Sequence, residues 1–259
     1  MYSIIKEKFL AYINSISFNQ EQKDILDTLK LTHTNRVIEL SEILAVSVFK
    51  NNNSAEYVEL AKIIAVLHDI ARWNQMFEYN GFTDVKGDHG ETGANTILQN
   101  DILNGLDESN KQIILTAVRE HNKKYINIYD DFTQIFVDII RDADRIDNFY
   151  IEVENYSNKD KSMKNILPFS DEHKLSQKIY DSIMNSSLAD VKDRETKIDF
   201  KFFKMAWIYD VKLIKSIEII RENKYIKNIY SDINSPDETM QTAYEKISQY
   251  LENPYKIIR

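Results

Sequence analysis

Glycine and proline are scarce in this chain, and the glycines are confined to one stretch. The 259 residues include five glycines and three prolines, about 3% of the chain against about 12% in average proteins. All five glycines lie between Gly81 and Gly105. Sandwiches, barrels and propellers need a turn about every 8–12 residues, so the composition argues against these folds, and an all-α fold is expected. Irregular backbone is expected between residues 81 and 105.

The composition also excludes several kinds of site and partner. Because the chain contains no cysteine, it has no disulfide, no thiolate metal site and no cysteine nucleophile. No run of 18 apolar residues occurs, and charged residues interrupt the first apolar residues, so neither a signal peptide nor a membrane span is expected. We therefore expect a cytoplasmic protein without a membrane partner.

The negative charge belongs to the first part of the chain. Residues 1–150 contain 15 Lys and Arg and 23 Asp and Glu, whereas residues 151–259 contain 18 of each class. A surface that binds a long nucleic acid is usually basic, so such a partner is not expected. The acidic first part is compatible with a site that binds cations.

Apolar residues recur at helical spacing on both sides of one polar segment. The predicted helices cover residues 21–49, 54 to about 73, 89 to a stop at Asn104-Gly105, 108 onward, 132 onward, 170–187, 199–224 and 236–252. Asn53 with Glu56, and Asp88 with Glu91, are the predicted capping pairs. The polar segment 154–171 contains Pro168 and predicts a boundary between a domain over residues 1–155, with its core at about 25–150, and a C-terminal helical extension over 156–259 packed on the same core.

Four histidines lie on the inner faces or at the ends of successive predicted helices. They are His33, His68, His89 and His121, accompanied by Asp69 and Asp144. His33 is expected in a buried stripe with Leu26, Leu29, Val37, Leu40, Leu44 and Val48. A single buried histidine usually bonds to a backbone carbonyl, but four in series with two aspartates each need a partner, at a cost of about 1–3 kcal/mol where one is missing. Shared cations would satisfy them together.

The types of these side chains select the class of metal. Neutral imidazoles with carboxylates and without thiolates suit Mn, Fe, Co, Ni or Zn, whereas calcium and magnesium prefer cages of oxygen ligands. On a helix, neighbouring side chains point about 100° apart, so Asp69 can bridge from the ion of His68 to a second ion. The expected ligands are His33, His68, Asp69 and Asp144 for one divalent ion, and Asp69, His89 and His121 for the other.

The ordered motifs resemble those of the HD-domain superfamily of metal-dependent phosphohydrolases. They are Thr-His33-Thr-Asn-Arg-Val, Val-Leu-His68-Asp69-Ile-Ala-Arg-Trp and Arg-Asp-Ala-Asp144-Arg-Ile-Asp. Asp-His89-Gly-Glu-Thr-Gly-Ala-Asn-Thr-Ile-Leu and Val-Arg-Glu-His121-Asn are similar to the two extra histidine motifs of its binuclear branch. The resemblance covers about residues 25–150 and implies an all-α helical bundle, here followed by additional C-terminal helices.

The resemblance further implies hydrolysis of a phosphomonoester or phosphodiester bond in a small nucleotide-type substrate. Two metals about 3.5–4 Å apart make a bridging water acidic enough to form the hydroxide that attacks phosphorus. Asp69, as a ligand of both ions, and Arg72 are the expected catalytic residues. Arg72, Lys86 and Arg145 are the expected substrate contacts; the alternative is a salt bridge to a neighbouring carboxylate for either arginine, and plain solvation for Lys86.

The same residues are compatible with two other functions. Binuclear HD relatives include mixed-valent di-iron oxygenases, which use much the same histidines and aspartates to activate dioxygen. Alternatively, the chain is a non-catalytic regulatory module that keeps its metals for structure, in which case every coordination position would be closed to solvent.

Overall fold

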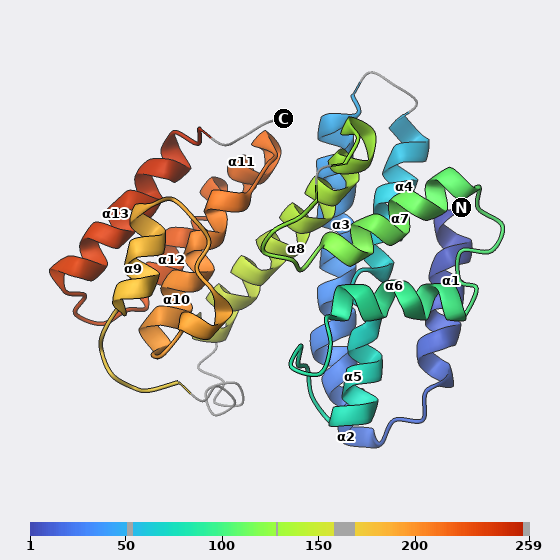
Figure 1. Ribbon diagram of the computed structural model, residues 1–259, viewed down its shortest axis with the longest axis horizontal. Helices are drawn as coiled ribbons and strands as arrows, with labels where there is room; N and C mark the ends of the chain where they lie inside the picture. Colours follow the sequence, from blue (N-terminus) through green and yellow to red (C-terminus); the bar gives the residue numbers. More distant parts are fainter. Residues whose placement is uncertain (51–53, 128, 158–168, 256–259) are drawn as a thin grey trace. The chain divides into compact units, whose positions relative to one another are not determined.

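The computed structural model describes residues 1–50, 54–127, 129–157 and 169–255 (Figure 1). Among these residues no strand is present, and an isolated bridge joins Ser170 to Thr196. The expected all-α fold class is confirmed. The chain divides into two compact units, Met1–Asp144 and Arg145–Arg259. The predicted boundary after residue 155 and the predicted packing of the extension on the same core stay predictions.

The first unit contains the histidine motifs. Its helices are α1 (Tyr2–Ser15), α2 (Gln20–Ile25), a π-helix (Leu26–Leu31), α3 (Thr32–Val48), α4 (Ser54–Leu67), α5 (Ala71–Tyr79), α6 (His89–Gln99), α7 (Glu108–Glu120) and the first half of α8 (Asp131–Ser157). Helix α3 packs along α4, and α6 packs along α7, while α4 also contacts α1 and α7 (Figure 1). Side chains such as Leu44, Leu60 and Phe136 are fully buried between these helices.

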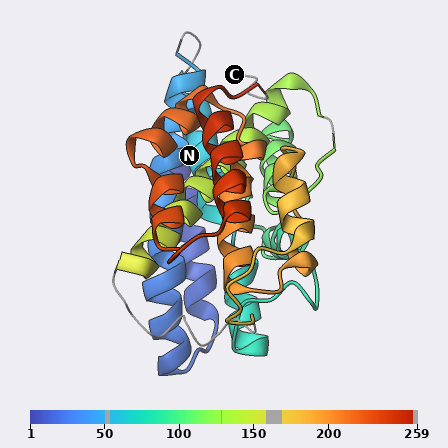
Figure 2. The same ribbon diagram turned by 90° about the vertical axis from the view of Figure 1, so that its left-hand side faces the viewer.

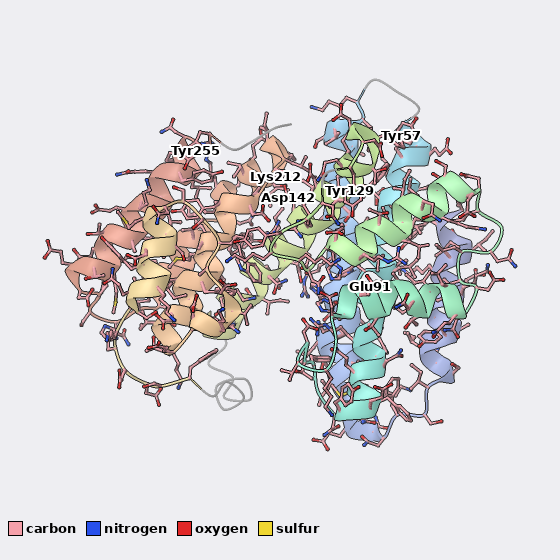
Figure 3. The ribbon with its side chains drawn as sticks, viewed as in Figure 1. Tyr57, Glu91, Tyr129, Asp142, Lys212 and Tyr255 are labelled. Atoms are coloured by element: carbon pink, nitrogen blue, oxygen red, sulfur yellow. The ribbon has the colours of Figure 1, made fainter. Side chains whose placement is uncertain are left out.

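Polar residues at the helix starts explain where several helices begin. The side chain of Asp88 accepts a hydrogen bond from the backbone N–H of Glu91, which is labelled in Figure 3, so the predicted start of α6 is confirmed. The other predicted capping residue, Asn53, lies outside the described residues. Helix α6 ends at Gln99 and not at Asn104, because Asp101 adopts a left-handed conformation with φ of 49° that breaks the helix.

The π-helix changes the face that its residues present. The predicted stripe assumed a regular α-helix from residue 21 to 49, and it is wrong at Leu29, whose side chain is 41% exposed. A π-helix has wider turns than an α-helix, so Leu29 rotates out of the stripe while Leu26 before it and Val37 after it remain buried. The same shift determines where Lys30 points.

The second unit has its own buried core. Its elements are the second half of α8, α9 (Gln177–Met184), a 3₁₀ turn (Val191–Asp193), α10 (Lys197–Met205), a second 3₁₀ turn (Ala206–Asp210), α11 (Ile214–Glu222), α12 (Tyr225–Ser231) and α13 (Glu238–Glu252). Helix α13, red in Figure 2, packs against α9 and the second 3₁₀ turn. The predicted helix over 199–224 is wrong in one respect, because extended backbone at Val211 and Leu213 separates α10 from α11. In the described parts of the chain, no helix combines the length and the apolar character needed to cross a membrane.

Candidate metal centre

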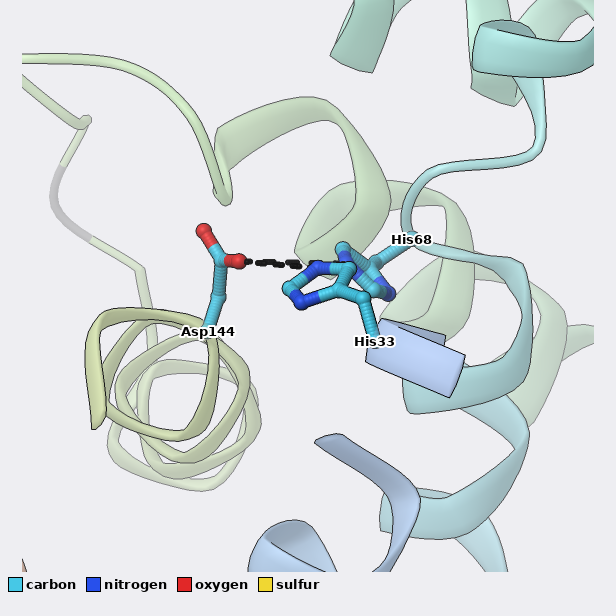
Figure 4. A group of neighbouring side chains, drawn as sticks. All are labelled: His33, His68 and Asp144. Atoms are coloured by element: carbon cyan, nitrogen blue, oxygen red, sulfur yellow. Dashed lines mark hydrogen bonds and ion pairs between the residues drawn. The ribbon is translucent and has the colours of Figure 1, made fainter. Parts of the chain in front are cut away.

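The six predicted ligands form two groups of three in the first unit. His33, His68 and Asp144 make one group, and Asp69, His89 and His121 make the other. Within each group the ligand atoms all lie within 4.8 Å of one another. Figure 4 shows Asp144 projecting from α8 toward the two imidazoles of the first group. The structure therefore brings together all six residues that the sequence singled out as metal ligands.

The doublet His68-Asp69 lies in a turn between α4 and α5. The predicted helix continued to about residue 73, but α4 ends at Leu67 and tight turns follow, with the N–H of Ile70 bonded to the oxygen of Leu67 and the N–H of Arg72 bonded to the oxygen of Asp69. Nδ1 of His68 lies 2.7 Å from the carbonyl oxygen of Ala65 in the last turn of α4. A carbonyl oxygen only accepts hydrogen bonds. Nδ1 of His68 therefore carries the ring proton, and Nε2 has a free lone pair.

His121 repeats this arrangement at the end of α7. It follows the last residue of the helix, and its Nδ1 lies 2.7 Å from the carbonyl oxygen of Val118. The guanidinium of Arg141, on α8, donates to the carbonyl oxygens of Glu120 at 2.6 Å and His121 at 3.2 Å. Hydrogen bonds from the His121 ring and from Arg141 therefore fix the last turn of α7. Nε2 of His121 points toward Asp69 and His89, the other members of its group.

His89 is oriented by a carboxylate of the glycine-bearing loop. It is the first residue of α6, and its Nδ1 lies 2.8 Å and 2.9 Å from the two oxygens of Asp84. Asp84 also accepts from Nη1 of Arg72 at 3.2 Å. Burial raises the pKa of the Asp84 carboxyl, but the hydrogen bond from His89 and the charge of Arg72 outweigh it and bring the pKa to about 2. A carboxylate that fixes the proton of a histidine on Nδ1 is a common support for a metal ligand.

In the second group, three hydrogen-bond acceptor atoms face one another. The Nε2 atoms of His89 and His121 lie 3.0 Å apart, and Oδ1 of Asp69 lies 3.4 Å and 3.8 Å from them. Both rings carry their proton on Nδ1, so two lone pairs and a carboxylate oxygen converge. Nη2 of Arg72 donates to Nε2 of His89 at 3.2 Å, which leaves the lone pair of His121 to be satisfied. A cation among these three atoms removes the repulsion, so this donor set fits a metal such as Zn, Mn or Fe.

Asp69 lies between the two groups. Its Oδ2 is 3.8 Å from Nε2 of His33 and 3.9 Å from Nε2 of His68, while Oδ1 faces the second group. Burial opposes ionisation of this carboxyl, yet Lys30, whose ammonium donates to Oδ2 at 2.8 Å, and the neighbouring imidazoles hold its pKa well below the usual value. Asp69 is therefore an ionised carboxylate with one oxygen toward each group.

The first group consists of two imidazoles and one partly exposed carboxylate. Nε2 of His33 lies 3.2 Å from Nε2 of His68 and 3.3 Å from Oδ1 of Asp144. Burial lowers the pKa of His68 to about 4, so this ring is neutral and able to bind a metal at neutral pH. Burial alone would raise the pKa of the Asp144 carboxyl. The hydrogen bond from His33 and the charge of that ring outweigh burial, so the pKa lies well below its usual value.

The predicted substrate contacts have other partners in the structure. Arg72 donates to Gln75 at 2.8 Å as well as to Asp84 and His89, so it braces the second group. Lys86 is exposed and lies with its ammonium 4.1 Å from the ring centroid of Tyr79. Arg145, in the second unit, pairs with the carboxylate of Asp210. The binding of substrate by these three residues stays a prediction.

Three residues that support the site were not singled out from the sequence. Lys30 contacts Asp69, Asp84 fixes His89, and Arg141 holds the end of α7. Arg141 lies three residues before the predicted ligand Asp144 on α8, a spacing that puts side chains on one helical face. Lys30 also lies three residues before a predicted ligand, His33, but in the π-helix, where this spacing does not apply. For Asp84 the sequence offers only its place in the loop before His89.

The comparison with protein families agrees with this geometry. Residues 31–148 match the family model of the HD domain. This segment, a little under half of the chain, has the sequence pattern of an HD domain. The matched range includes all six grouped residues, and Lys30 lies one residue before it. Searches among curated proteins and among solved structures gave no match to this chain.

HD domains bind divalent metals and commonly belong to hydrolases. The two groups of histidine and aspartate in this chain are of the kind that holds such ions. A metal-dependent hydrolase activity is therefore what the HD domain indicates.

Proposed function

We propose that this protein is a metal-dependent phosphohydrolase that cleaves a phosphomonoester or phosphodiester bond of a small nucleotide-type substrate. The observation that carries this proposal is the position of Asp69, whose Oδ2 faces His33 and His68 and whose Oδ1 faces His89 and His121. A carboxylate shared in this way between two sets of imidazoles is typical of two-metal sites that act on phosphate esters.

In this proposal the six grouped residues are the metal ligands. His33, His68 and Asp144 with Oδ2 of Asp69 would hold one ion, and His89 and His121 with Oδ1 of Asp69 would hold the other. When bound, divalent ions at these positions supply an activated water and positive charge against the phosphoryl oxygens.

The protein's own groups prepare the site for this chemistry. Hydrogen bonds from Nδ1 fix the rings of His68, His89 and His121 with Nε2 toward the centre, so no rotation is needed when an ion binds. Asp69 is ionised, and Arg72 holds the loop carboxylate of Asp84 against His89. The side chains of the four histidines are at most 5% exposed, whereas that of Asp144 is 22% exposed. Asp144 is therefore the most solvent-exposed of the six grouped residues.

The proposal is tested by metal analysis combined with a substrate panel. The protein is purified, its metal content is measured, and hydrolysis of nucleoside phosphates, cyclic nucleotides and aryl phosphates is assayed with Mn, Fe, Co, Ni or Zn, with and without a chelator. We expect hydrolysis that a chelator removes and that Asp69→Ala abolishes, while Asp27→Ala, at an exposed residue of the π-helix, retains it. A metal-loaded protein that is inert across the panel contradicts the proposal, and an iron-loaded protein with an O₂-dependent spectral change favours the oxygenase alternative.

A further inference from the structure

Lys30 is a cation beside the candidate metal centre that the HD motifs do not include. It belongs to the π-helix, and its ammonium lies 2.8 Å from Oδ2 of Asp69. The same ammonium lies 4.9 Å from the ring centroid of Phe82, in the glycine-bearing loop. Its side chain is 18% exposed. Lys30 therefore lies where the metal centre, the loop and solvent meet.

The ammonium of Lys30 has unused hydrogen-bonding capacity. A lysine carries three N–H donors, and Asp69 is the acceptor that the described part of the chain supplies. The guanidinium of Arg72, in contrast, is engaged by Gln75, Asp84 and His89. The remaining donors of Lys30 are available to oxygens of a bound molecule, and a cation next to a two-metal site suits a phosphoryl group.

Phe82 adds an aromatic surface at the same place. The ring is partly exposed, and a Cβ built on the neighbouring Gly81 would have no atom within 4 Å, so the backbone beside the ring borders open space. Aromatic side chains stack on nucleobases and on other flat rings. A molecule whose phosphoryl group reaches Lys30 has its organic part within reach of Phe82.

We propose that Lys30 and Phe82 form the substrate-binding pair of this site, with Lys30 donating to the phosphoryl oxygens and Phe82 packing against a flat aromatic ring of the same molecule. The preferred substrates are then phosphate esters that carry an aromatic ring, such as nucleoside phosphates, over esters of aliphatic alcohols. This inference rests on the proposed phosphohydrolase function and adds the residues that select the substrate.

The first test compares variants on two substrates, adenosine 5′-monophosphate and glycerol phosphate. Lys30→Met is expected to lower kcat/KM on both by about 10- to 100-fold, while Phe82→Leu lowers it by about tenfold on the nucleotide alone. Lys62→Met is a closely matched control, because Lys62 also pairs with a carboxylate at 2.8 Å, lies 4.9 Å from a ring centroid and is 21% exposed, but on α4 with Glu42 and Tyr2. Phe77→Leu, at an exposed ring of α5, is the control for Phe82.

Metal content separates substrate binding from a merely structural role of Lys30. Removing a positive charge beside a cation site favours metal binding, so Lys30→Met should retain the wild-type metal content or exceed it. If Lys30→Met instead loses metal in proportion to activity, Lys30 only positions Asp69 and the inference is overturned.

A binding measurement, read before the ligand is consumed, tests the pair independently of the rate of turnover. In Phe82→Trp, adenosine 5′-monophosphate should quench the added fluorescence and glycerol phosphate should not, and Lys30→Met in the same background should weaken the quenching by about tenfold or more. Equal responses to the two ligands, or none, overturn the role of Phe82. If the wild type hydrolyses these substrates and both Lys30→Met and Phe82→Leu do so equally well, the substrate-binding role of the pair is overturned and the proposed function stands. If the wild type hydrolyses no substrate, the proposed function itself is contradicted.

Discussion

The Nε2 atoms of His89 and His121 lie 3.0 Å apart because α6 and α7 approach each other at Gly90. A Cβ built on Gly90 would lie 2.7 Å from Oδ1 of Asn122, 2.8 Å from the carbonyl oxygen of Arg119 and 2.9 Å from that of Val118. Two of these atoms are backbone and cannot move without moving α7. The absence of a side chain at Gly90 thus sets the distance between two candidate metal ligands.

Gly90→Ala should therefore destabilise the protein and weaken the second group. Overpacking costs about 1–3 kcal/mol, offset by up to about 1 kcal/mol from the better helix propensity of alanine. We expect a lower free energy of unfolding in urea and loss of metal from the group of Asp69, His89 and His121. Gly81→Ala is the control, because its Cβ has no neighbour within 4 Å. Equal stability of the two variants would contradict the close approach.

The role of Asp84 predicts a change in metal affinity. Removing a carboxylate that supports a metal-ligating histidine typically lowers metal affinity by about 10- to 100-fold. Asp84→Ala should therefore raise, by this factor, the Kd for the ion held by Asp69, His89 and His121, as measured by calorimetric titration of the chelator-treated protein. Asp27→Ala, at an exposed position, should leave the Kd unchanged. Wild-type affinity in Asp84→Ala would show that the loop carboxylate does not support His89.

Helical periodicity predicted most of the site but not its supports. It placed His33, His68 and His121 on inward faces, and the chemistry of their side chains predicted the grouping with Asp69 and Asp144 that the structure has. It could not predict the turn at His68-Asp69 or the π-helix before His33, because both depend on hydrogen bonds that local spacing does not encode. Lys30 acquires its partner only through a tertiary contact over 39 residues, and Asp84 meets His89, 5 residues on, only through the shape of the loop between them.

The burial of His68 predicts how the stability of the metal-free protein depends on pH. Its pKa is about 4 in the folded protein against a usual value of 6.5, so the unfolded chain binds a proton on this ring between these values and the folded chain does not. Stability should fall as the pH is lowered through that window, by about 3 kcal/mol in total. Urea unfolding of chelator-treated protein at pH 7, 5.5 and 4.5 measures this.

A substitution identifies His68 as the source of that slope. His68→Gln should reduce the loss of stability between pH 6.5 and 4, whereas His173→Gln, at an exposed histidine of the second unit, should not. If the free energy of unfolding depends on pH in the same way in His68→Gln and in the wild type, the His68 ring binds its proton equally well in the folded and unfolded chains. The prediction that folded His68 is neutral between pH 6.5 and 4 is then wrong.

Arg141 provides a stability test at the other end of α7. It is 3% exposed and donates to the carbonyl oxygens of Glu120 and His121. In Arg141→Met these two carbonyls lose a charged donor, and a buried group left without a partner costs about 1–3 kcal/mol. We expect a loss of unfolding free energy of that order or more, together with weaker metal binding in the second group, because the orientation of His121 depends on the same turn.

The control for this prediction is Arg119→Met, at a partly exposed residue that pairs with Glu91. It should lower the free energy of unfolding by less than about 1 kcal/mol. Equal losses in the two variants would show that Arg141 does not hold the turn.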